Sequence, residues 1–297
     1  MPELPEVENV RRTLANLIIG RTITSVNRRR RDVVHGPASD RDLMLGHRIS
    51  KIMRHGKQIA VLGTTVPTAP RRCVCIHLGM SGSLRLVRLR PEDRPSRTAS
   101  GPRSHHRACH DDSHVHIVWG LDNGDCIRFR DPRRFGGIWT YPGLNQLLEE
   151  RWRELGPDAL TIQPSILYRR LHRTQRGIKA ALLDQNVIAG LGNIYTDELL
   201  FRCHLNPLTA SRDLKLNQVQ RLVRCMRRLL SRATAEGGST LRDYVDGDGN
   251  PGRFQTGHQV YGRAGELCQN CHEILQKIQV AGRTTVYCPS CQGTTIP

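Results

Sequence analysis

The spacing of apolar residues changes along the chain, and these changes divide it into segments of different secondary structure. Residues 7–20 place apolar side chains at helical spacing and end on a glycine that suits a helix stop. From about residue 21 to 140 the pattern turns to short β-rich runs, such as QIAVLG and CIRFR, bounded by Gly, Pro or Asp-Asn-Gly turns. From about residue 147 the helical period returns and continues to Gly237. The pattern therefore predicts a helix, a β-sandwich and then a helical bundle.

Two stretches carry no such period. Residues 90–112 are rich in Pro, Ser, Arg and His, which predicts a flexible surface insertion. A turn-rich strip follows the helical part and leads into a cysteine-rich end. The predicted division is an N-terminal β-sandwich domain over 1–146, a helical domain over 147–240, a linker over 241–262 and a small cysteine-rich module over 263–297.

Four of the ten cysteines form two close pairs in that module. Cys268 and Cys271 are separated by two residues, as are Cys288 and Cys291, and sixteen residues lie between the pairs. This is the spacing of a zinc ribbon, in which two cysteine pairs supply four thiolates to one tetrahedral ion. So short a segment needs such an ion to fold. We therefore predict one structural Zn²⁺, with disulfides or chance spacing as the alternatives.

The charge of the chain points to a polyanionic partner. Its formal net charge is +18, and only five of its 45 basic residues are lysines. No apolar run has the eighteen or so residues that a membrane span needs, and the acidic N-terminus does not resemble a signal peptide. We therefore expect a soluble, intracellular protein that binds nucleic acid rather than a membrane. The alternative is a basic protein with no such partner.

The opening MPELPEVENV raises a chemical question. If Met1 is removed, Pro2 becomes a secondary amine and Glu3 places a carboxyl beside it. A secondary amine that attacks C1′ of a sugar gives an iminium with no N–H proton to lose, so the cation persists as an electron sink. The alternative is that the two residues only form the entry to a helix.

Two glycines in the helical part also have a chemical interpretation. Gly190 and Gly192 directly precede a helix predicted to start near Asn193, and backbone amides at such a terminus bind phosphate well. Basic residues precede the glycines and place this interpretation about level with its alternative: Arg169, Arg170, Arg173, Arg176 and Lys179. The alternative is an ordinary turn between two helices.

Two glycine-flanked turns in the β-rich part carry large apolar residues. Met80 lies in LGMSGS, and Phe135 follows Arg133 and Arg134 in DPRRFGG. An apolar side chain held at a rigid tip among arginines can enter a DNA duplex between bases. The alternative is that Met80 and Phe135 are core residues.

Together these motifs resemble one family. In order, the chain carries MPELPEVE, RHGK over 54–57, HLGMSGSLR, DPRRFGG, LDQNVIAGLGNIYTDE, the GNPGRF and QVYGR strip, and the closing C-x2-C-x16-C-x2-C. This series resembles the bacterial formamidopyrimidine-DNA glycosylases almost end to end. The departures are the 90–112 insertion and the stretch HRTQRG, which has Arg173 or Thr174 where relatives often carry a DNA-contacting lysine.

The resemblance implies an α+β multidomain fold: an N-terminal β-sandwich with flanking helices, a helix-two-turn-helix domain and a C-terminal zinc finger. It implies a bifunctional DNA glycosylase and apurinic/apyrimidinic (AP) lyase of base excision repair, which removes 8-oxoguanine and formamidopyrimidines through an N-terminal proline Schiff base and β,δ-elimination. The partner is double-stranded DNA that contains oxidised bases or abasic sites. A monomer associated with the nucleoid through DNA is the default expectation.

The resemblance also implies roles for single residues. Pro2 is the nucleophile and Glu3 the acid that acts on the deoxyribose. Lys57 is the proton donor for β-elimination and a phosphate contact, and Arg283 is the group for δ-elimination. The residues expected to contact DNA are Met80, His114, Arg133, Phe135, Thr174 and Asn193.

Two other functions stay open at this level. A relative of endonuclease VIII would remove oxidised pyrimidines by the same proline chemistry, but such relatives usually open PEGPE, and this chain has Leu4 where they carry glycine. The other is a non-catalytic zinc-ribbon protein that only binds DNA, for which the features other than Pro2 and Glu3 would suffice.

Overall fold

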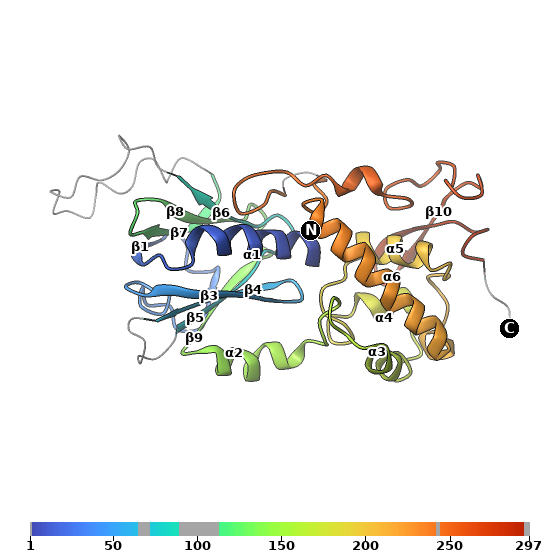
Figure 1. Cartoon of the computed structure of the whole chain (residues 1–297), viewed down its shortest axis with the longest axis horizontal. Coiled ribbons are helices and arrows are strands. Elements are labelled where there is room, and N and C mark those ends of the chain that lie inside the picture. The colour runs from blue at the N-terminus through green and yellow to red at the C-terminus, as the bar shows by residue number, and fades with distance from the viewer. Residues whose placement is uncertain (1, 65–71, 89–112, 242–243, 294–297) are drawn as a thin grey trace. The chain divides into compact units, whose positions relative to one another are not determined.

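The computed structural model describes residues 2–64, 72–88, 113–241 and 244–293. They form two compact units whose segments alternate along the chain (Figure 1). The first unit comprises residues 1–2, 6–153 and 237–252, and the second comprises residues 3–5, 154–236 and 253–297. The insertion predicted over 90–112 lies outside the described residues. The four-part division of the sequence is finer than these two units and stays a prediction.

The first unit contains two β-sheets and helix α1 (Leu4–Ile18) from Glu6 onward. The antiparallel four-stranded sheet has the order β1 (Ile23–Arg28), β7 (Val115–Leu121), β8 (Cys126–Arg130) and β6 (Ser83–Val87). The five-stranded sheet has the order β2 (Val34–His35), β9 (Gly137–Tyr141), β5 (Arg72–His77), β4 (Gln58–Thr64) and β3 (Arg48–His55), in which only β2 and β9 pair in parallel. Helix α2 (Leu144–Glu150) follows β9.

Both sheets and α1 contribute to one apolar core. Leu14 of α1, Phe129 of the four-stranded sheet and Ile138 of the five-stranded sheet are fully buried in the same cluster. Two sheets that bury their apolar faces in one core form a sandwich. The structure therefore confirms the predicted β-sandwich.

The second unit is helical and carries a β-hairpin. Its helices are α3 (Pro164–Leu171), α4 (Ile178–Leu183), α5 (Asn193–Arg202) and α6 (Leu216–Ala235), and its hairpin pairs β10 (Gln276–Val280) with β11 (Arg283–Tyr287). Short 3-10 turns lie at Ser211–Asp213 and Phe254–Gly257, and another at Trp152–Glu154 spans the boundary between the two units. The structure thus confirms the predicted α+β architecture, with the two large sheets in the first unit and helices α3 to α6 in the second.

Helix α5 is the centre of the second unit. Residues 194–201 of this helix are all buried, and α4, α6 and β11 pack against it. A helix buried on every side is usually apolar on every side. Asp197 and Glu198 lie within this run, so each of these carboxylates needs polar partners in the interior.

Within the described parts of the chain, no helix is both long and apolar enough to cross a bilayer.

Candidate functional site

The Glu3 carboxylate occupies the N-terminus of α5. Its side chain is buried, with 1% of its surface exposed. The backbone N–H groups of Gly192, Ile194 and Tyr195 donate hydrogen bonds to its two oxygens at 2.7, 2.8 and 3.4 Å. The first N–H groups of a helix have no partners within the helix, and the helix dipole favours negative charge there. These amides, which the sequence offered as a possible phosphate site, therefore bind the protein's own carboxylate.

The two glycines before α5 make this contact possible. A Cβ atom on Gly192 would lie 2.4 Å from Cδ of Glu3. Gly190 has φ near +118°, and a Cβ there would lie 2.5 Å from Cδ1 of Leu4, whose N–H donates to the Gly190 carbonyl at 3.1 Å. Both positions need glycine because the start of the chain approaches this backbone too closely for a side chain.

Pro2 and Glu6, on either side of this segment, belong to the first unit and are both buried there. One oxygen of the Glu6 carboxylate accepts the backbone N–H of Ser239 at 2.7 Å. The hydroxyl of Tyr244 donates to the Glu6 carbonyl at 3.1 Å. Glu6 and its backbone thus attach the segment over 237–252 to the beginning of α1.

Lys57 lies at the hairpin between β3 and β4, after Gly56, and its side chain is only 8% exposed. The charge of Lys57 affects the pKa of His77 on β5. Burial lowers the pKa of His77 to about 4, and the positive charges of Lys57 and Arg151 contribute to this lowering, while Asp131 opposes it. The imidazole is therefore neutral at neutral pH, and Lys57 supplies positive charge next to it.

A buried carboxylate joins the two predicted tips in the first unit. Asp131 accepts the Ser81 hydroxyl at 2.7 Å with one oxygen and the Gly136 N–H at 2.7 Å with the other. The turns also touch directly, because a Cβ on Gly79 would lie 2.3 Å from the nitrogen of Gly136 and 2.4 Å from the carbonyl carbon of Phe135. The LGMSGS and DPRRFGG turns therefore form one packed element.

Four of the residues expected to contact DNA lie in this element or are bonded to it. Phe135 is 55% exposed, so the structure excludes the core alternative for this residue. The guanidinium carbon of Arg133, also exposed, lies 4.7 Å from the centre of the Phe135 ring. Met80 is half-buried, and His114 is exposed with a left-handed φ near +69°. The His114 carbonyl accepts the Asp131 N–H at 3.1 Å, which ties it to the same turns.

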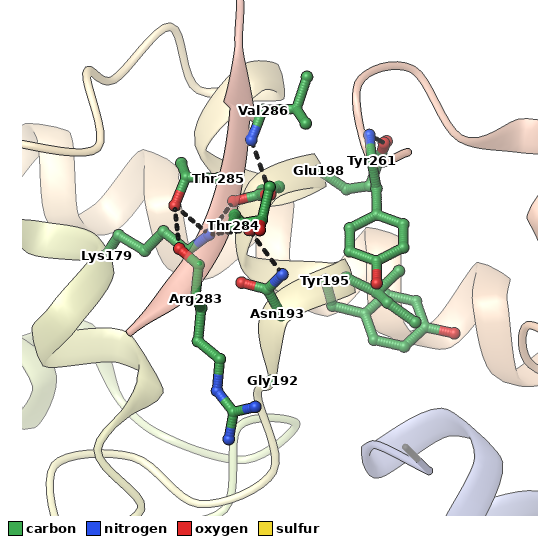
Figure 2. A network of polar contacts seen from close by, with 12 residues as sticks. Lys179, Gly192, Asn193, Tyr195, Glu198, Tyr261, Arg283, Thr284, Thr285 and Val286 are labelled. Atoms are coloured by element: carbon green, nitrogen blue, oxygen red, sulfur yellow. Dashed lines mark hydrogen bonds and ion pairs between the residues drawn. The ribbon is translucent and has the colours of Figure 1, made fainter. Parts of the chain in front are cut away.

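Asn193 and Arg283 lie in the second unit, where α5 meets the hairpin. The Asn193 side chain does not cap its helix; its amide nitrogen donates to the carbonyl of Thr284 at 2.8 Å. Arg283 is exposed at the start of β11, and Figure 2 shows its side chain pointing away from the Lys179 ammonium.

The basic residues before Gly190 do not all lie on the surface. Arg176 is exposed, and both its backbone N–H and its Nε donate to the hydroxyl of Thr174, at 3.2 and 3.1 Å. Lys179 is fully buried and forms an ion pair with Asp197. The interpretation of Lys179 as part of a surface phosphate site is therefore wrong.

The four cysteines of the predicted ribbon come together in the second unit. Their Sγ atoms lie within 4.8 Å of one another, and the separations of three of the pairs are 3.4, 3.4 and 3.8 Å. A tetrahedral zinc with Zn–S bonds of about 2.3 Å places its sulfurs about 3.8 Å apart. Cys268, Cys271, Cys288 and Cys291 thus fit one structural zinc ion.

Sequence reasoning missed three buried carboxylates that organise these segments. Besides Asp131 and Asp197, Glu198 accepts three successive backbone N–H groups, those of residues 259–261, at 2.8–3.0 Å. It thereby fixes the QVYGR strip against α5. The sequence did carry a signal for Asp197 and Glu198, because acidic residues within a largely apolar run such as NIYTDELLF are rarely buried unless they are paired.

Three family models match the chain in succession. The formamidopyrimidine-DNA glycosylase N-terminal domain matches residues 1–138. The formamidopyrimidine-DNA glycosylase H2TH domain matches residues 155–245. A zinc finger found in FPG and IleRS matches residues 265–293.

Whole-chain relatives agree with these matches. A formamidopyrimidine-DNA glycosylase of Bacillus subtilis is 36% identical over 98% of this chain and 99% of its own length. One of Thioalkalivibrio sulfidiphilus is 37% identical over 98% of this chain and 100% of its own length. Among solved structures, the MutM (FPG) protein of Thermus thermophilus is 35% identical, with a TM-score of 0.80 over 98% of this chain and 99% of that one.

Proposed function

This chain belongs to the formamidopyrimidine-DNA glycosylase family, and from that premise we propose that it is a bifunctional DNA glycosylase and AP lyase of base excision repair. The observation that carries the proposal is the environment of Glu3, the residue that follows Pro2 in the sequence. Its buried carboxylate accepts hydrogen bonds from three backbone N–H groups. A helix entry alone would not require a buried carboxylate at the end of another helix. A protein that only binds DNA would not require it either.

The substrates follow from the relatives. Solved complexes of Lactococcus lactis Fpg contain Fapy-dG DNA or abasic-site DNA, and a MutM complex contains carbocyclic 8-oxo-G DNA. We extend these to the present chain as double-stranded DNA with oxidised purines or abasic sites. A further Lactococcus lactis Fpg complex contains an oxidised pyrimidine, so an assay of lesion preference includes that class.

The chemistry of base removal assigns Pro2 and Glu3 complementary roles. The lone pair of the Pro2 nitrogen forms the bond to C1′, and the base leaves with the electrons of the C1′–N bond. The proton displaced from the Pro2 nitrogen passes through Glu3 to O4′ of the sugar, the C1′–O4′ bond breaks, and an iminium forms between nitrogen and C1′. The amides that hold Glu3 stabilise the negative charge of the carboxylate before it takes up that proton.

Strand cleavage then uses the iminium as the electron sink. Loss of the C2′ proton expels the 3′ phosphate, and loss of the C4′ proton expels the 5′ phosphate. We assign Lys57 to proton transfer in the first elimination and Arg283 to the second.

The packed element around Asp131 supplies the wedge. Met80, Arg133 and Phe135 fill the space that the flipped nucleotide leaves, since Phe135 is exposed on a fixed turn. His114, Asn193 and Thr174 contact the backbone of the DNA. The zinc ion holds the fold of the module that carries Arg283. The enzyme works as a monomer on the chromosome in the bacterial cytoplasm.

Borohydride trapping on an 8-oxoguanine duplex tests this function. The amine exists only when Pro2 is the free N-terminus, because with Met1 attached the nitrogen is an amide with a delocalised lone pair. Protein that begins at Pro2 should form a trapped covalent adduct and cleave the strand. A preparation that retains Met1, verified by mass spectrometry, should bind the duplex and do neither. Trapping by the blocked protein would assign the nucleophile to a lysine instead.

A further inference from the structure

A fully buried lysine lies behind the strand that carries Arg283. Lys179 on α4 has no exposed surface. Its ammonium lies 2.5 Å from a carboxylate oxygen of Asp197, 2.6 Å from the hydroxyl of Thr285 and 3.4 Å from the carbonyl of Thr284 (Figure 2). These three acceptors match the three N–H donors of an ammonium.

Further hydrogen bonds attach β11 to helix α5. The second carboxylate oxygen of Asp197 accepts the backbone N–H of Val286 at 3.1 Å. Asn193 donates to the Thr284 carbonyl at 2.8 Å. Each of the three residues that follow Arg283 is therefore held by a side chain of α4 or α5.

The same helix holds Glu3. The first turn of α5 binds the Glu3 carboxylate through Gly192 and Ile194, and Asp197 lies about one turn further along. All of these residues belong to the second unit. Helix α5 thus serves as the common support for Glu3 at its end and for the Arg283 strand along its side.

Stability alone does not account for a buried ion pair at this place. Burial lowers the pKa of Lys179, while Asp197 acts in the opposite direction, so burial of the charge has a cost that the pair must offset. Apolar residues of similar volume often stabilise a protein as well as such a pair does. The directional contacts of the pair, by contrast, fix the position of a strand along a helix, which apolar side chains do less sharply.

We propose that Lys179 and Asp197 are positioning residues for δ-elimination. They fix β11 on α5 so that the Arg283 guanidinium reaches the sugar whose ring Glu3 has opened. Neither residue touches the substrate. The inference rests on the proposed function. It states that this ion pair controls how much of the product has lost both phosphates and how much has lost only one.

The test compares variants on an abasic-site duplex, with zinc content measured in each preparation. Lys179→Met should lower the ratio of δ to β products by on the order of tenfold or more, because a displacement of about 1 Å can cost up to a hundredfold in rate. Borohydride trapping and β-elimination should stay near wild type. Arg232→Met, which removes the Arg232–Glu236 ion pair at the end of α6, is the matched control and should leave the ratio unchanged.

A second variant separates positioning from folding. Lys179→Met leaves Asp197 buried without its partner, whereas Lys179→Met with Asp197→Leu removes both charges and should restore stability. The folded double variant should still favour β products. In an Arg283→Ala background, Lys179→Met should cause no further loss of δ-elimination, because both changes act through the same guanidinium.

Three results would overturn the proposal: a wild-type product ratio in the folded double variant, an equal fall of β- and δ-elimination, or additive losses with Arg283→Ala. Absence of trapping in the wild-type protein is a different result, since it would refute the proposed function itself.

Discussion

Lys57 can be distinguished from the many arginines of this chain by what its side chain can do with a proton. An ammonium can give up a proton when its surroundings favour the neutral form, whereas a guanidinium keeps its charge. Lys57 is buried next to His77, which burial and nearby cations hold in the neutral form. A lysine at this position can therefore transfer a proton, which an arginine of the same charge cannot do at useful rates.

Lys57→Arg separates these two properties. The variant keeps the charge but cannot donate a proton at useful rates, so we expect strand cleavage to slow by about a hundredfold while lesion binding stays near wild type. Single-turnover cleavage of an abasic-site duplex, measured beside its dissociation constant, decides the matter. Cleavage at the wild-type rate would reduce Lys57 to a phosphate contact.

Glu8 predicts a pH dependence of stability. Burial by itself would raise the pKa of Glu8, but hydrogen bonds from Arg11 and Arg12 and the charges of Arg11 and Arg54 lower it from 4.5 to about 2. A lowered pKa stabilises the folded protein above pH 4.5, and this contribution is lost as the pH falls towards 2. Because Arg12 is partly exposed, we discount the shift and expect about 2 kcal/mol at pH 7.

Urea unfolding of Glu8→Gln checks this sign. The stability advantage of the wild type should narrow by about 1 kcal/mol or more between pH 7 and pH 3. Zinc release on acidification affects both proteins alike and cancels in the difference. Glu149→Gln, at an exposed position on α2, is the matched control and should show no such trend. A difference that widened at low pH would contradict the assignment.

The reach of sequence reasoning is clearest at single residues. The roles proposed for Pro2, Glu3, Lys57 and Arg283 rest on motifs around them that resemble a family. The partners of Glu3 could not be predicted, since they are backbone amides about 190 positions further along the chain. Gly192 shows the limit well: its sequence context allowed either a phosphate site or an ordinary turn, and only the folded chain shows that its N–H binds Glu3.

At the level of elements, the two turns around Asp131 brace each other within the proposed DNA surface. A buried carboxylate bonded to both turns, together with backbone contact at Gly79, leaves little freedom for the exposed Phe135 ring. A rigid tip loses little conformational entropy when it enters a duplex.

Phe135→Ala removes the wedge and leaves the turn. We expect lesion binding and base release to fall about tenfold, with little change on undamaged duplex, because only the opened helix uses the ring. Equilibrium binding to paired lesion and undamaged duplexes measures this. Leu148→Ala on α2 offers a control of similar exposure. Equal losses on both duplexes would assign Phe135 to general folding.

The zinc module gives the second prediction at this scale. Cys268→Ser should release the ion and abolish lesion binding, because the hairpin that carries Arg283 needs all four thiolates for its fold. Metal analysis together with a binding assay tests this, and Cys225→Ser, outside the four, should keep its zinc. One equivalent of zinc with intact binding in the Cys268 variant would refute the ligand assignment.

The strands differ in how well the sequence predicts them. QIAVLG and CIRFR coincide closely with β4 and β8, because both strands are buried and their apolar residues dominate. Strand β3 gives a weaker signal, since it is the last strand in the order of its sheet and most of its side chains are accessible to solvent. Its basic residues at exposed positions hide the apolar alternation on which strand prediction depends.

For the whole molecule, the net charge is the property that most directly indicates the kind of ligand. The net charge of +18 suits a ligand that carries one negative charge for about every 1.7 Å of its helix axis. The order of sandwich, helical part and zinc module could be predicted from periodicity and cysteine spacing. The interleaving of the two compact units could not, because it depends on contacts such as Glu6 with Ser239 between distant parts of the chain.

Salt should weaken binding to undamaged duplex steeply. Each neutralised phosphate adds about 0.9 to the slope of log affinity against log salt, so six contacts lower the affinity about a thousandfold between 50 and 200 mM. Fluorescence anisotropy over a salt series measures the slope. A slope shallower than about 2 would show that the positive charge serves some other partner.

The interleaved units also set a condition on synthesis. The first unit needs residues 237–252, because Tyr244 packs against its core and Ser239 binds Glu6. A ribosome that has translated the sandwich through residue 153 must add about a hundred more residues before that strip is complete. At about 5–20 residues per second this takes roughly 5–20 s. During that interval the nascent sandwich is unfinished and its apolar surface is open to chaperones and proteases, and any product that terminates before residue 237 never completes it.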